Sequence, residues 1–357
     1  MKLNKLAILA LSIVLIFTSC SNDDDSTTPV VPLGDYENGI IITEEGNFTN
    51  GTGSISFVSN DLEYVENTVY ENVNGETLGN LVQSMAFDGN LGYIIENGSN
   101  ALKVVNRYTF QVITTISSGL DNPRYMTVVN GKGYITNWGD GTDTTDDYVA
   151  VLDLNSNTIT SNIAVSEGPE QVLVNANKLY VSHKGGHNVN NVVSVINTID
   201  SSLETIAVND VPDEMFIDNQ GHLIVLSSGA NQSWLTPPVE TLASITRIDL
   251  NDNSIISNME FSEGQHPDLM TYSNGNAYYI LNNGVYSLSD SDTGLPAASL
   301  FNITAGYAYG LSVKNNLLYL TDASFTENST LKVYDISSGT ETNSFDVGLG
   351  ASKIYFN

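Results

Sequence analysis

The sequence is short of cysteine and of basic residues, and each shortage excludes a class of protein. Its 357 residues include one cysteine, Cys20, so the chain forms no internal disulfide and contains no CxxCH haem attachment site. Lysine and arginine number 12 against 41 aspartates and glutamates, which gives a net charge of -29. This field repels nucleic-acid phosphates, so nucleic acid is not an expected partner. The simplest interpretation of the acidic excess is a solvated surface that keeps the protein soluble.

Histidines are also few, and the motifs of common enzyme classes are missing. The sequence has four histidines, no GxSxG elbow and no phosphate-binding loop. His183 and His187 lie in one HKGGH segment, which could form a transition-metal pair or supply a general base with Lys184; a polar surface role is the alternative. Acid-base catalysis by Glu170 or Asp213 stays open, but no spacing calls for it. We therefore do not expect an enzyme.

The first 37 residues are expected to lie outside the folded domain. Residues 1–19 have a basic start and the apolar run LAILALSIVLIF, which is the layout of a secretory signal peptide. The segment FTSC resembles the lipobox of bacterial prolipoproteins, which implies lipidation of Cys20, with residues 20–37 as a flexible acidic linker. The run Asp23 to Asp25 resembles the export signal of Bacteroidota surface lipoproteins. We predict an outer-membrane lipoprotein, exposed at the cell surface, that contacts the membrane through its lipid alone.

From residue 38 onward, one pattern recurs. The segment LDNPRYMTVVNGKGYITNWGDG, residues 120–141, contains an extended stretch, an Asn-Gly turn and a second extended stretch. Other segments repeat its first strand, and an apolar anchor residue marks each copy. The anchors are Met85, Met126, Val172, Met215, Met270, Leu311 and Ile354. They are spaced by 41, 46, 43, 55, 41 and 43 residues, which is the period of a β-propeller.

Each repeat predicts four antiparallel strands, which form one blade. A first strand leads through an Asn- or Gly-containing hairpin turn to a second strand such as GYIT or LYVS, and a variable loop then precedes the third and fourth strands. Residues 350–357 supply only a first strand, whereas residues 39–72 begin with a second strand. Joining the two closes the ring and hides open strand edges. The prediction is an all-β, seven-bladed propeller over residues 38–357, with six or eight blades as the alternatives.

These repeats resemble a known family. The Pro-x-x-apolar openings, the GYIT- and LYVS-like strands and the VLDLNSNTI-like turns are similar to those of the YVTN, or YncE-like, seven-bladed propellers. Together with the lipoprotein leader, they resemble Bacteroidota surface lipoproteins of this fold, some of which bind cobalamin and pass it to a TonB-dependent transporter. The resemblance implies that the loops between second and third strands and the connections between blades share one face, which is the candidate binding face.

The two enlarged loops on this face contain the only tryptophans. Trp138 lies in residues 137–148 and Trp234 in residues 227–244. Large amphipathic rings in polar loops are typical of sites that grip ligands or partners. The alternative is that each ring folds back over a blade. Phe48 and Phe325 occupy corresponding loops and are weaker candidates.

Polar residues at the start of the first strands form a second set of candidates, because they should point at the channel axis. Tyr125, Gln171 and Glu214 lie beside this set, and a merely hydrated channel is the alternative interpretation. The residues that follow the proline position are Gln83, Arg124, Glu170, Asp213, Asp268, Tyr309 and Ser352.

Two ion sites are weaker predictions. Asp140, Asp143 and Asp146 cluster in one loop, and hard cations such as calcium bind clustered oxygens, although the spacing does not match the twelve-residue calcium loop. The second is a central ion at the ends of the second strands, which would resemble the gluconolactonase type of propeller. Its ligands would be Glu44, Asn137, Asn282 and Asp322.

The sequence thus favours a surface protein that captures a cobalamin-like or other bulky nutrient for a TonB-dependent transporter. The alternatives are a surface interaction or adhesion module without a small ligand, and a metal-dependent hydrolase or lyase. The expected ligand contacts are Trp138, Trp234, Arg124, Tyr125, Tyr309, Asp140, His183, Lys184, Asp213 and Asp268.

Overall fold

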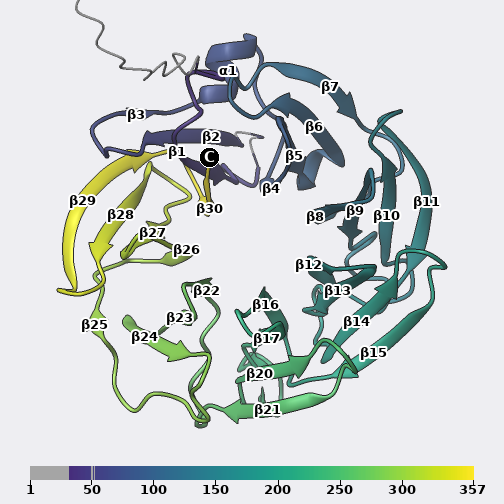
Figure 1. Ribbon diagram of the computed structural model, residues 1–357, viewed down its shortest axis with the longest axis vertical. Helices are drawn as coiled ribbons and strands as arrows, with labels where there is room; N and C mark the ends of the chain where they lie inside the picture. The colour runs from purple at the N-terminus through teal and green to yellow at the C-terminus, as the bar shows by residue number, and fades with distance from the viewer. Residues whose placement is uncertain (1–31, 50, 52) are drawn as a thin grey trace, which may run out of the picture. The chain divides into compact units, whose positions relative to one another are not determined.

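Seven four-stranded antiparallel sheets form a ring around a central axis in the computed structural model (Figure 1). The structure describes residues 32–49, 51 and 53–357, and residues Leu33–Asn357 form one compact unit. The expected signal peptide, the lipidation site Cys20 and the linker up to residue 31 lie outside the described residues. The prediction of a seven-bladed all-β propeller is confirmed.

The strands follow the predicted repeat, with the first strand of each blade next to the channel. Along the chain they are β1 Gly39–Glu44, β2 Ser54–Ser59, β3 Val65–Glu66, β4 Val82–Asp88, β5 Leu91–Glu96, β6 Ala101–Asn106, β7 Val112–Ile116, β8 Pro123–Val129, β9 Lys132–Asn137, β10 Tyr148–Asp153, β11 Thr158–Ala164, β12 Pro169–Asn175, β13 Lys178–His183, β14 Val192–Asn197, β15 Leu203–Ala207, β16 Pro212–Ile217, β17 His222–Ser227, β18 Asn231–Gln232, β19 Val239–Glu240, β20 Ser244–Asp249, β21 Ile255–Glu260, β22 Met270–Ser273, β23 Asn276–Leu281, β24 Gly284–Ser289, β25 Phe301–Asn302, β26 Ala308–Lys314, β27 Leu317–Asp322, β28 Ser329–Asp335, β29 Thr340–Val347 and β30 Ala351–Phe356.

The two ends of the propeller share one blade, as predicted. Its strand order is β3-β2-β1-β30, and β30 pairs with β1 in an antiparallel register that places Ile42 opposite Ile354. The outermost strand of this blade is only β3, after which the chain forms the short helix α1 Val69–Asn74. The range 39–72 therefore contains the start of a helix as well as strands. Val69 and Tyr70 of this helix are buried in the core beside β2.

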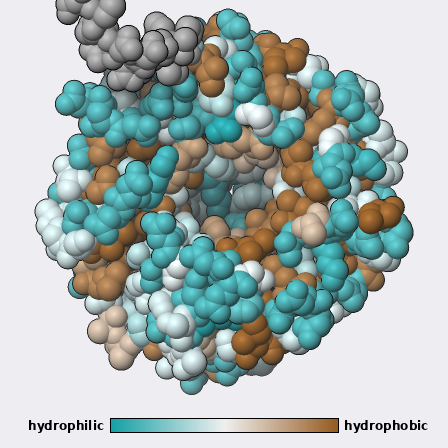
Figure 2. All heavy atoms as spheres, in the orientation of Figure 1, coloured by the Kyte–Doolittle hydropathy of each residue, from teal (hydrophilic) through white to brown (hydrophobic). Residues whose placement is uncertain are grey.

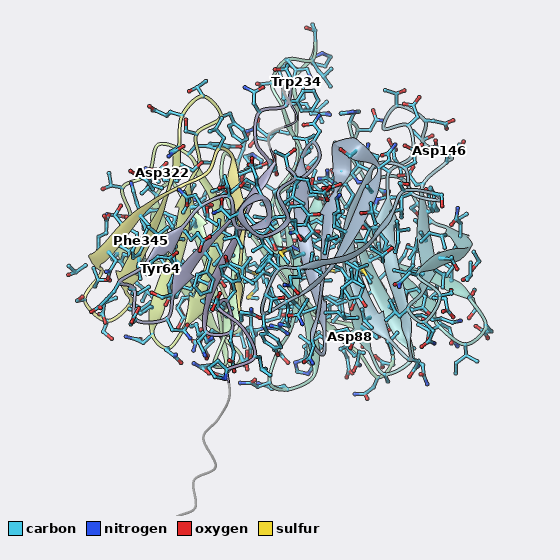
Figure 3. All side chains as sticks on the ribbon, turned by 90° about the horizontal axis from the view of Figure 1, so that it is seen from above. Tyr64, Asp88, Asp146, Trp234, Asp322 and Phe345 are labelled. Atoms are coloured by element: carbon cyan, nitrogen blue, oxygen red, sulfur yellow. The ribbon has the colours of Figure 1, made fainter. Side chains whose placement is uncertain are left out.

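The hairpin turns between first and second strands have the predicted chemistry. Positive φ angles occur at Gly89, Asn130, Gly131 and Asn274, among others, and this is the region that glycine and asparagine tolerate best. These turns lie on the face away from the variable loops: Figure 3 shows Asp88 on one side of the propeller, and Trp234 and Asp146 on the other. We call the side with Trp234 and Asp146 the loop-rich face.

The anchors of the repeat fill the space between neighbouring blades. Met126 packs in one cluster with Ile95 and Leu102 of the preceding blade and with Ile135 of its own. A Cβ on Gly133, the first letter of GYIT, would lie 2.3 Å from the Met126 Cε, so the absence of a side chain there leaves room for the end of Met126. Burial of each such side chain contributes about 1.5 to 3 kcal/mol, so the anchors stabilise the packing of neighbouring blades.

The 55-residue repeat contains an arm that the other blades lack. Residues 228–243, between β17 and β20, include the two-stranded sheet β18-β19 and present Trp234 at the top of the loop-rich face (Figure 3). Within the described residues, no helix has the length and apolar character needed to cross a membrane.

Candidate functional site

Hydroxyl groups fix the starts of the first strands around the channel. Each of three blades donates a hydroxyl hydrogen bond to a backbone carbonyl of the next: Ser84 to Arg124 (2.6 Å), Thr136 to Glu170 (2.7 Å) and Ser182 to Asp213 (2.9 Å). The accepting residues belong to the set predicted to point at the axis. The blade interface therefore positions their side chains at the mouth of the channel.

Arg124 is the best-held cation of this set. Its Nε and Nη2 donate to the two carboxylate oxygens of Glu170 at 3.0 and 2.7 Å, and its Nη1 donates to Gln83 at 2.7 Å. The guanidinium carbon lies 4.0 Å from the centre of the Trp138 ring, and the indole N–H donates to the carbonyl of Pro169 at 2.9 Å. Arg124 and Glu170 are 14% and 3% exposed, so this bidentate pair is buried and stacked. One face of Trp138 is therefore occupied by Arg124.

Two lysines neutralise the next carboxylates around the axis. Lys184 Nζ lies 2.6 Å from Asp213 Oδ2, and Lys353 Nζ lies 2.9 Å from Glu214 Oε1. Burial alone would raise the pKa of Asp213, but Lys184 and Lys353 hold it below its ordinary value. Burial dominates at Glu214 and raises its pKa despite the lysine.

These groups form what we call the charged neck, which narrows the channel to a cavity of about 90 Å³. Tyr309 donates to Glu45 at 3.0 Å, and burial raises the pKa of both Glu45 and Asp268. The neck is lined by Glu45, Tyr125, Glu170, Lys184, Asp213, Glu214, Asp268, Leu269, Tyr309, Ser352 and Lys353. Three cations thus face five carboxylates when Arg124 is included, and every one of these cations has a carboxylate partner.

A larger cleft opens beside the neck on the loop-rich face. Its volume is about 550 Å³, and it shares Glu45 and Tyr309 with the neck. The cleft is lined by Glu45, Phe48, Asn80, Leu81, Gln83, Asn97, Gly98, Asn100, Asp121, Asn122, Arg124, Trp138, Gly139, His187 and Tyr309. The lining combines aromatic rings with an unusual number of asparagine amides.

The amides of the cleft are ordered by one another. The short 3-10 turn η1 Asn97–Ser99 places Asn97, whose amide donates to the Asn122 side chain and, at 3.1 Å, to the Pro123 carbonyl. Asn100 donates to Asp121 at 3.1 Å and accepts the backbone N–H of Asn122 at 2.7 Å. A network of this kind holds its polar atoms in fixed directions before any ligand arrives.

The ends of the second strands serve the fold. Glu44 accepts the backbone N–H of Gly348 at 2.6 Å, Asn137 that of Asp121 at 3.0 Å, and Asp322 that of Gly306 at 2.8 Å. Each side chain therefore caps the connection that leads into the first strand of its own blade. Asn282, the fourth proposed ligand of a central ion, lies in a tight turn with positive φ.

The carboxylates of the acidic loop, residues 140–146, accept hydrogen bonds from within the loop itself. Asp140 accepts from the backbone and side chain of Thr142, Asp143 does the same for Thr145, and Asp146 accepts the backbone N–H of Asp140. Across residues 32–49, 51 and 53–357, no three His, Cys, Asp or Glu side chains converge in a group that could hold a metal ion.

Three of the predicted ligand contacts lie outside the cleft and the neck. Trp234 is 74% exposed at the tip of the arm, and Asp140 is exposed in its loop. His183 is buried, with Nδ1 3.3 Å from the carbonyl oxygen of Glu167, and burial lowers its pKa to about 4. Its neighbour His187 instead lies at the cleft, with its ring 6.2 Å from that of Trp138. The structure brings together Arg124, Trp138, Tyr125, Tyr309, Lys184, Asp213 and Asp268.

Sequence reasoning missed Lys353, Glu45 and the amide network. Lys353 directly precedes the anchor of its blade, which is the position that Tyr125 and Glu214 occupy in theirs. The alignment of the repeats could therefore have identified Lys353 as a residue of the neck. The amides gave no signal, because asparagines in loops are typical of ordinary turns.

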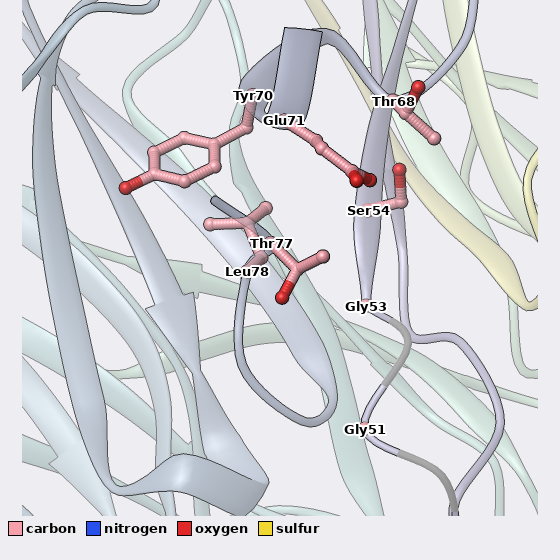
Figure 4. A pocket seen from close by; sticks show the side chains of 8 residues that line it. All are labelled: Gly51, Gly53, Ser54, Thr68, Tyr70, Glu71, Thr77 and Leu78. Atoms are coloured by element: carbon pink, nitrogen blue, oxygen red, sulfur yellow. The ribbon is translucent and has the colours of Figure 1, made fainter. Parts of the chain in front are cut away.

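Other cavities lie beside or beyond this site. On the far side of the neck, the channel widens to about 310 Å³ beside all seven anchors, and Figure 2 shows a hollow at the centre of the ring. A pocket of about 160 Å³ lies beside α1, where Figure 4 shows Tyr70, Glu71 and Thr77 around it. None of the predicted ligand contacts lines that second pocket.

Comparisons with known proteins support the fold. A family model described as "Domain of unknown function (DUF5074)" matches residues 38–356. The chain is similar to the periplasmic gluconolactonase PpgL of Pseudomonas aeruginosa, with a TM-score of 0.66 and 9% identity over 89% of this chain and 98% of that one. It is also similar to dihydro-heme d1 dehydrogenase NirN (TM-score 0.57, 14% identity, 92% and 78% covered) and to AztD from Citrobacter koseri (TM-score 0.57, 9% identity, 88% and 96% covered). None of the curated proteins compared matches this sequence. At these identities the likeness shows the propeller fold alone.

Proposed function

We propose that this chain, which belongs to the DUF5074 family, is a binding protein that captures a bulky nutrient in the cleft of its loop-rich face. The observation that carries the proposal is the cleft: a space of about 550 Å³ whose walls combine aromatic rings with mutually ordered amides. Concave sites with apolar walls and a few convergent polar groups are the usual form of ligand sites.

A binding role is favoured over a catalytic one by the state of the charged groups. Arg124, Lys184 and Lys353 are each paired with a buried or largely buried carboxylate. A general acid or base needs a proton-transfer atom that faces the substrate. The three paired carboxylates direct their oxygens at cations, and Glu45, which lines both the cleft and the neck, accepts a hydrogen bond from Tyr309. The neck therefore serves best as a rigid floor beneath the ligand.

The proposed setting is the outer face of the outer membrane, with the lipid on Cys20 as anchor. The layout of residues 1–25 supports this setting. Capture at a surface is useful only if the ligand is handed on, so we propose a TonB-dependent receptor as the partner, in line with the resemblance to cobalamin-binding surface lipoproteins.

The proposal is tested by calorimetry and thermal shift on the purified protein, with cobalamin as the first nutrient. Phe48 is 75% exposed at the cleft, and Ile199, which does not line it, is 77% exposed, so Phe48→Ala and Ile199→Ala are matched variants. We expect Phe48→Ala to weaken ligand binding about tenfold and Ile199→Ala to leave it unchanged. Absence of binding for every nutrient tested, or equal effects of the two variants, would overturn the proposal.

A surface interaction module is the second candidate, and one observation favours it. The arm presents Trp234 at 74% exposure, with Leu235 and Val239 also exposed beside it. Exposed tryptophans are frequent anchors of protein interfaces. If Trp234→Ala abolishes binding to a receptor while the cleft variants do not, the interaction surface is the arm.

A further inference from the structure

Three groups in the cleft have hydrogen-bonding capacity that the described residues do not use. The Oδ1 atom of Asn80 is buried without a partner, while its amide nitrogen donates to the carbonyl of Phe48 at 3.3 Å. Arg124 has five N–H groups, of which three donate to Glu170 and Gln83. The Asn122 side chain accepts from Asn97, and its amide nitrogen donates to none of the described residues. A buried acceptor without a partner is rare in proteins and indicates a missing donor.

The unused groups include both hydrogen-bond donors and acceptors. Asn80 offers an acceptor, whereas Arg124 and Asn122 offer donors. A hydroxyl group both donates and accepts, so it satisfies either kind. A carboxylate or phosphate only accepts, and an ammonium group only donates, so each of these would leave part of the cleft unpaired. The mixture therefore selects a ligand with several hydroxyl groups.

The charges of the site point the same way. Glu45 and Asp121 line the cleft, and Arg124 is already neutralised by Glu170 at 2.7 Å. The chain as a whole has a net charge of -29. An anionic ligand would meet repulsion from both sources without gaining a free cation, so an uncharged ligand is favoured.

The aromatic rings supply the remaining contact. Phe48, Trp138 and Tyr309 line the cleft, and Tyr309 stacks on Tyr307 with ring centres 5.2 Å apart. Phe48 is 75% exposed, so most of its ring surface is open to contact with a ligand. The C–H faces of pyranose rings are apolar while their edges bear hydroxyls, so sugars match a site with flat rings and amides.

We infer that the ligand of the cleft is a neutral oligosaccharide. The inference rests on the proposed function, since it names the class of nutrient that the same cleft captures. The sugar rings lie against Phe48 and Tyr309, and their hydroxyls pair with Asn80, Asn122 and Arg124.

The test uses Trp138 as a built-in reporter. The chain has two tryptophans, so Trp234→Phe leaves Trp138 as the only one, at the cleft. This variant is titrated with maltohexaose, cellohexaose, mannohexaose and xylohexaose, with hexagalacturonate as the anionic counterpart, glucosamine hexamer as the cationic counterpart, and cobalamin. We expect a saturable change in tryptophan fluorescence with at least one neutral hexasaccharide, and binding about tenfold weaker or absent for the charged ones.

Second-site variants assign the binding to the cleft. Asn122→Ala and Phe48→Ala in the Trp234→Phe background should each weaken oligosaccharide binding about tenfold, and Ile199→Ala should not change it. Tighter binding of hexagalacturonate or of the glucosamine hexamer than of every neutral sugar overturns the inference. Binding of cobalamin without any oligosaccharide also overturns it, while leaving the capture function standing. Binding of none of the probes overturns both.

Discussion

Replacement of Glu44 by glutamine should remove a loss of folding stability that grows with pH. Glu44 lies in the blade that closes the ring. The Glu44 side chain is fully buried at the end of β1, where one carboxylate oxygen accepts hydrogen bonds from Ser56 and from the Gly348 N–H, and the other is buried without a partner among the described residues. Burial raises the pKa of Glu44 from 4.5 to about 7. The folded protein therefore favours the neutral acid, which glutamine imitates.

The sign and size of the effect follow from this pKa. The unfolded chain binds the proton only below about 4.5, so the stability gained from the protonated form is fully present below that pH and is lost as pH rises through about 7. The interval between the two pKa values corresponds to about 3 kcal/mol. Glu44→Gln should therefore stabilise the protein by up to about 3 kcal/mol at pH 8 and by little at pH 4.5, which is a gain of about 5 °C in Tm at pH 8.

The assay is thermal unfolding of the wild-type protein and the variant from pH 4.5 to pH 8.5, with Glu327→Gln as the control for removal of an exposed carboxylate. The difference in Tm between Glu44→Gln and wild type should grow with pH, while that of the control stays flat. A difference that is constant over this range would show that Glu44 is ionised or protonated alike in both states, and would refute the reasoning.

Other variants test the neck, the blade interface and the arm. Arg124→Met leaves Glu170 buried without its partner and should cost about 3 to 5 kcal/mol in chemical unfolding, whereas the double variant with Glu170→Leu should recover most of it. A Cβ on Gly310 would lie 1.6 Å from the carbonyl oxygen of Ser352, so Gly310→Ala should lower stability by at least about 1 to 3 kcal/mol, seen as a lower midpoint in denaturant. Trp234→Ala removes a side chain that is 74% exposed and should change the unfolding free energy by less than about 0.5 kcal/mol; a larger loss would mean that the arm is part of the core.

The fold could be predicted from the sequence because its determinants repeat. Anchors such as Met126 recur in all seven blades, and turns such as Asn130-Gly131 recur in the six blades whose first and second strands are consecutive, so each copy supports the interpretation of the others. Closure of the ring followed from the half-blades at the two ends, since both would otherwise leave an open edge. Residues that point at the axis could be named for the same reason.

The site could be predicted only in part, because its loops do not repeat. The sequence predicted Trp138 for the loop-rich face but could not show that Arg124, at the start of β8 in the same blade, covers one side of its ring, because this depends on the direction of both side chains. The sequence predicted that Glu44, Asn137 and Asp322 occupy equivalent positions at the ends of second strands. Their use as backbone caps depends on the direction of each side chain, which the pattern does not encode.

The pairing of β30 with β1 has a consequence for the order of assembly. Lys353, which neutralises Glu214 in the neck, belongs to the last strand of the propeller, and β1 is its first. Six blades can form from neighbouring segments as they become available, but the seventh requires two segments that are separated by almost the whole domain, and such distant contacts form late. The pairing of β30 with β1 closes the ring, and the same step brings Lys353 to Glu214 in the neck. Until β30 joins the ring, Glu214 lacks its partner Lys353, so the neck reaches its final charge balance only in the last step of folding.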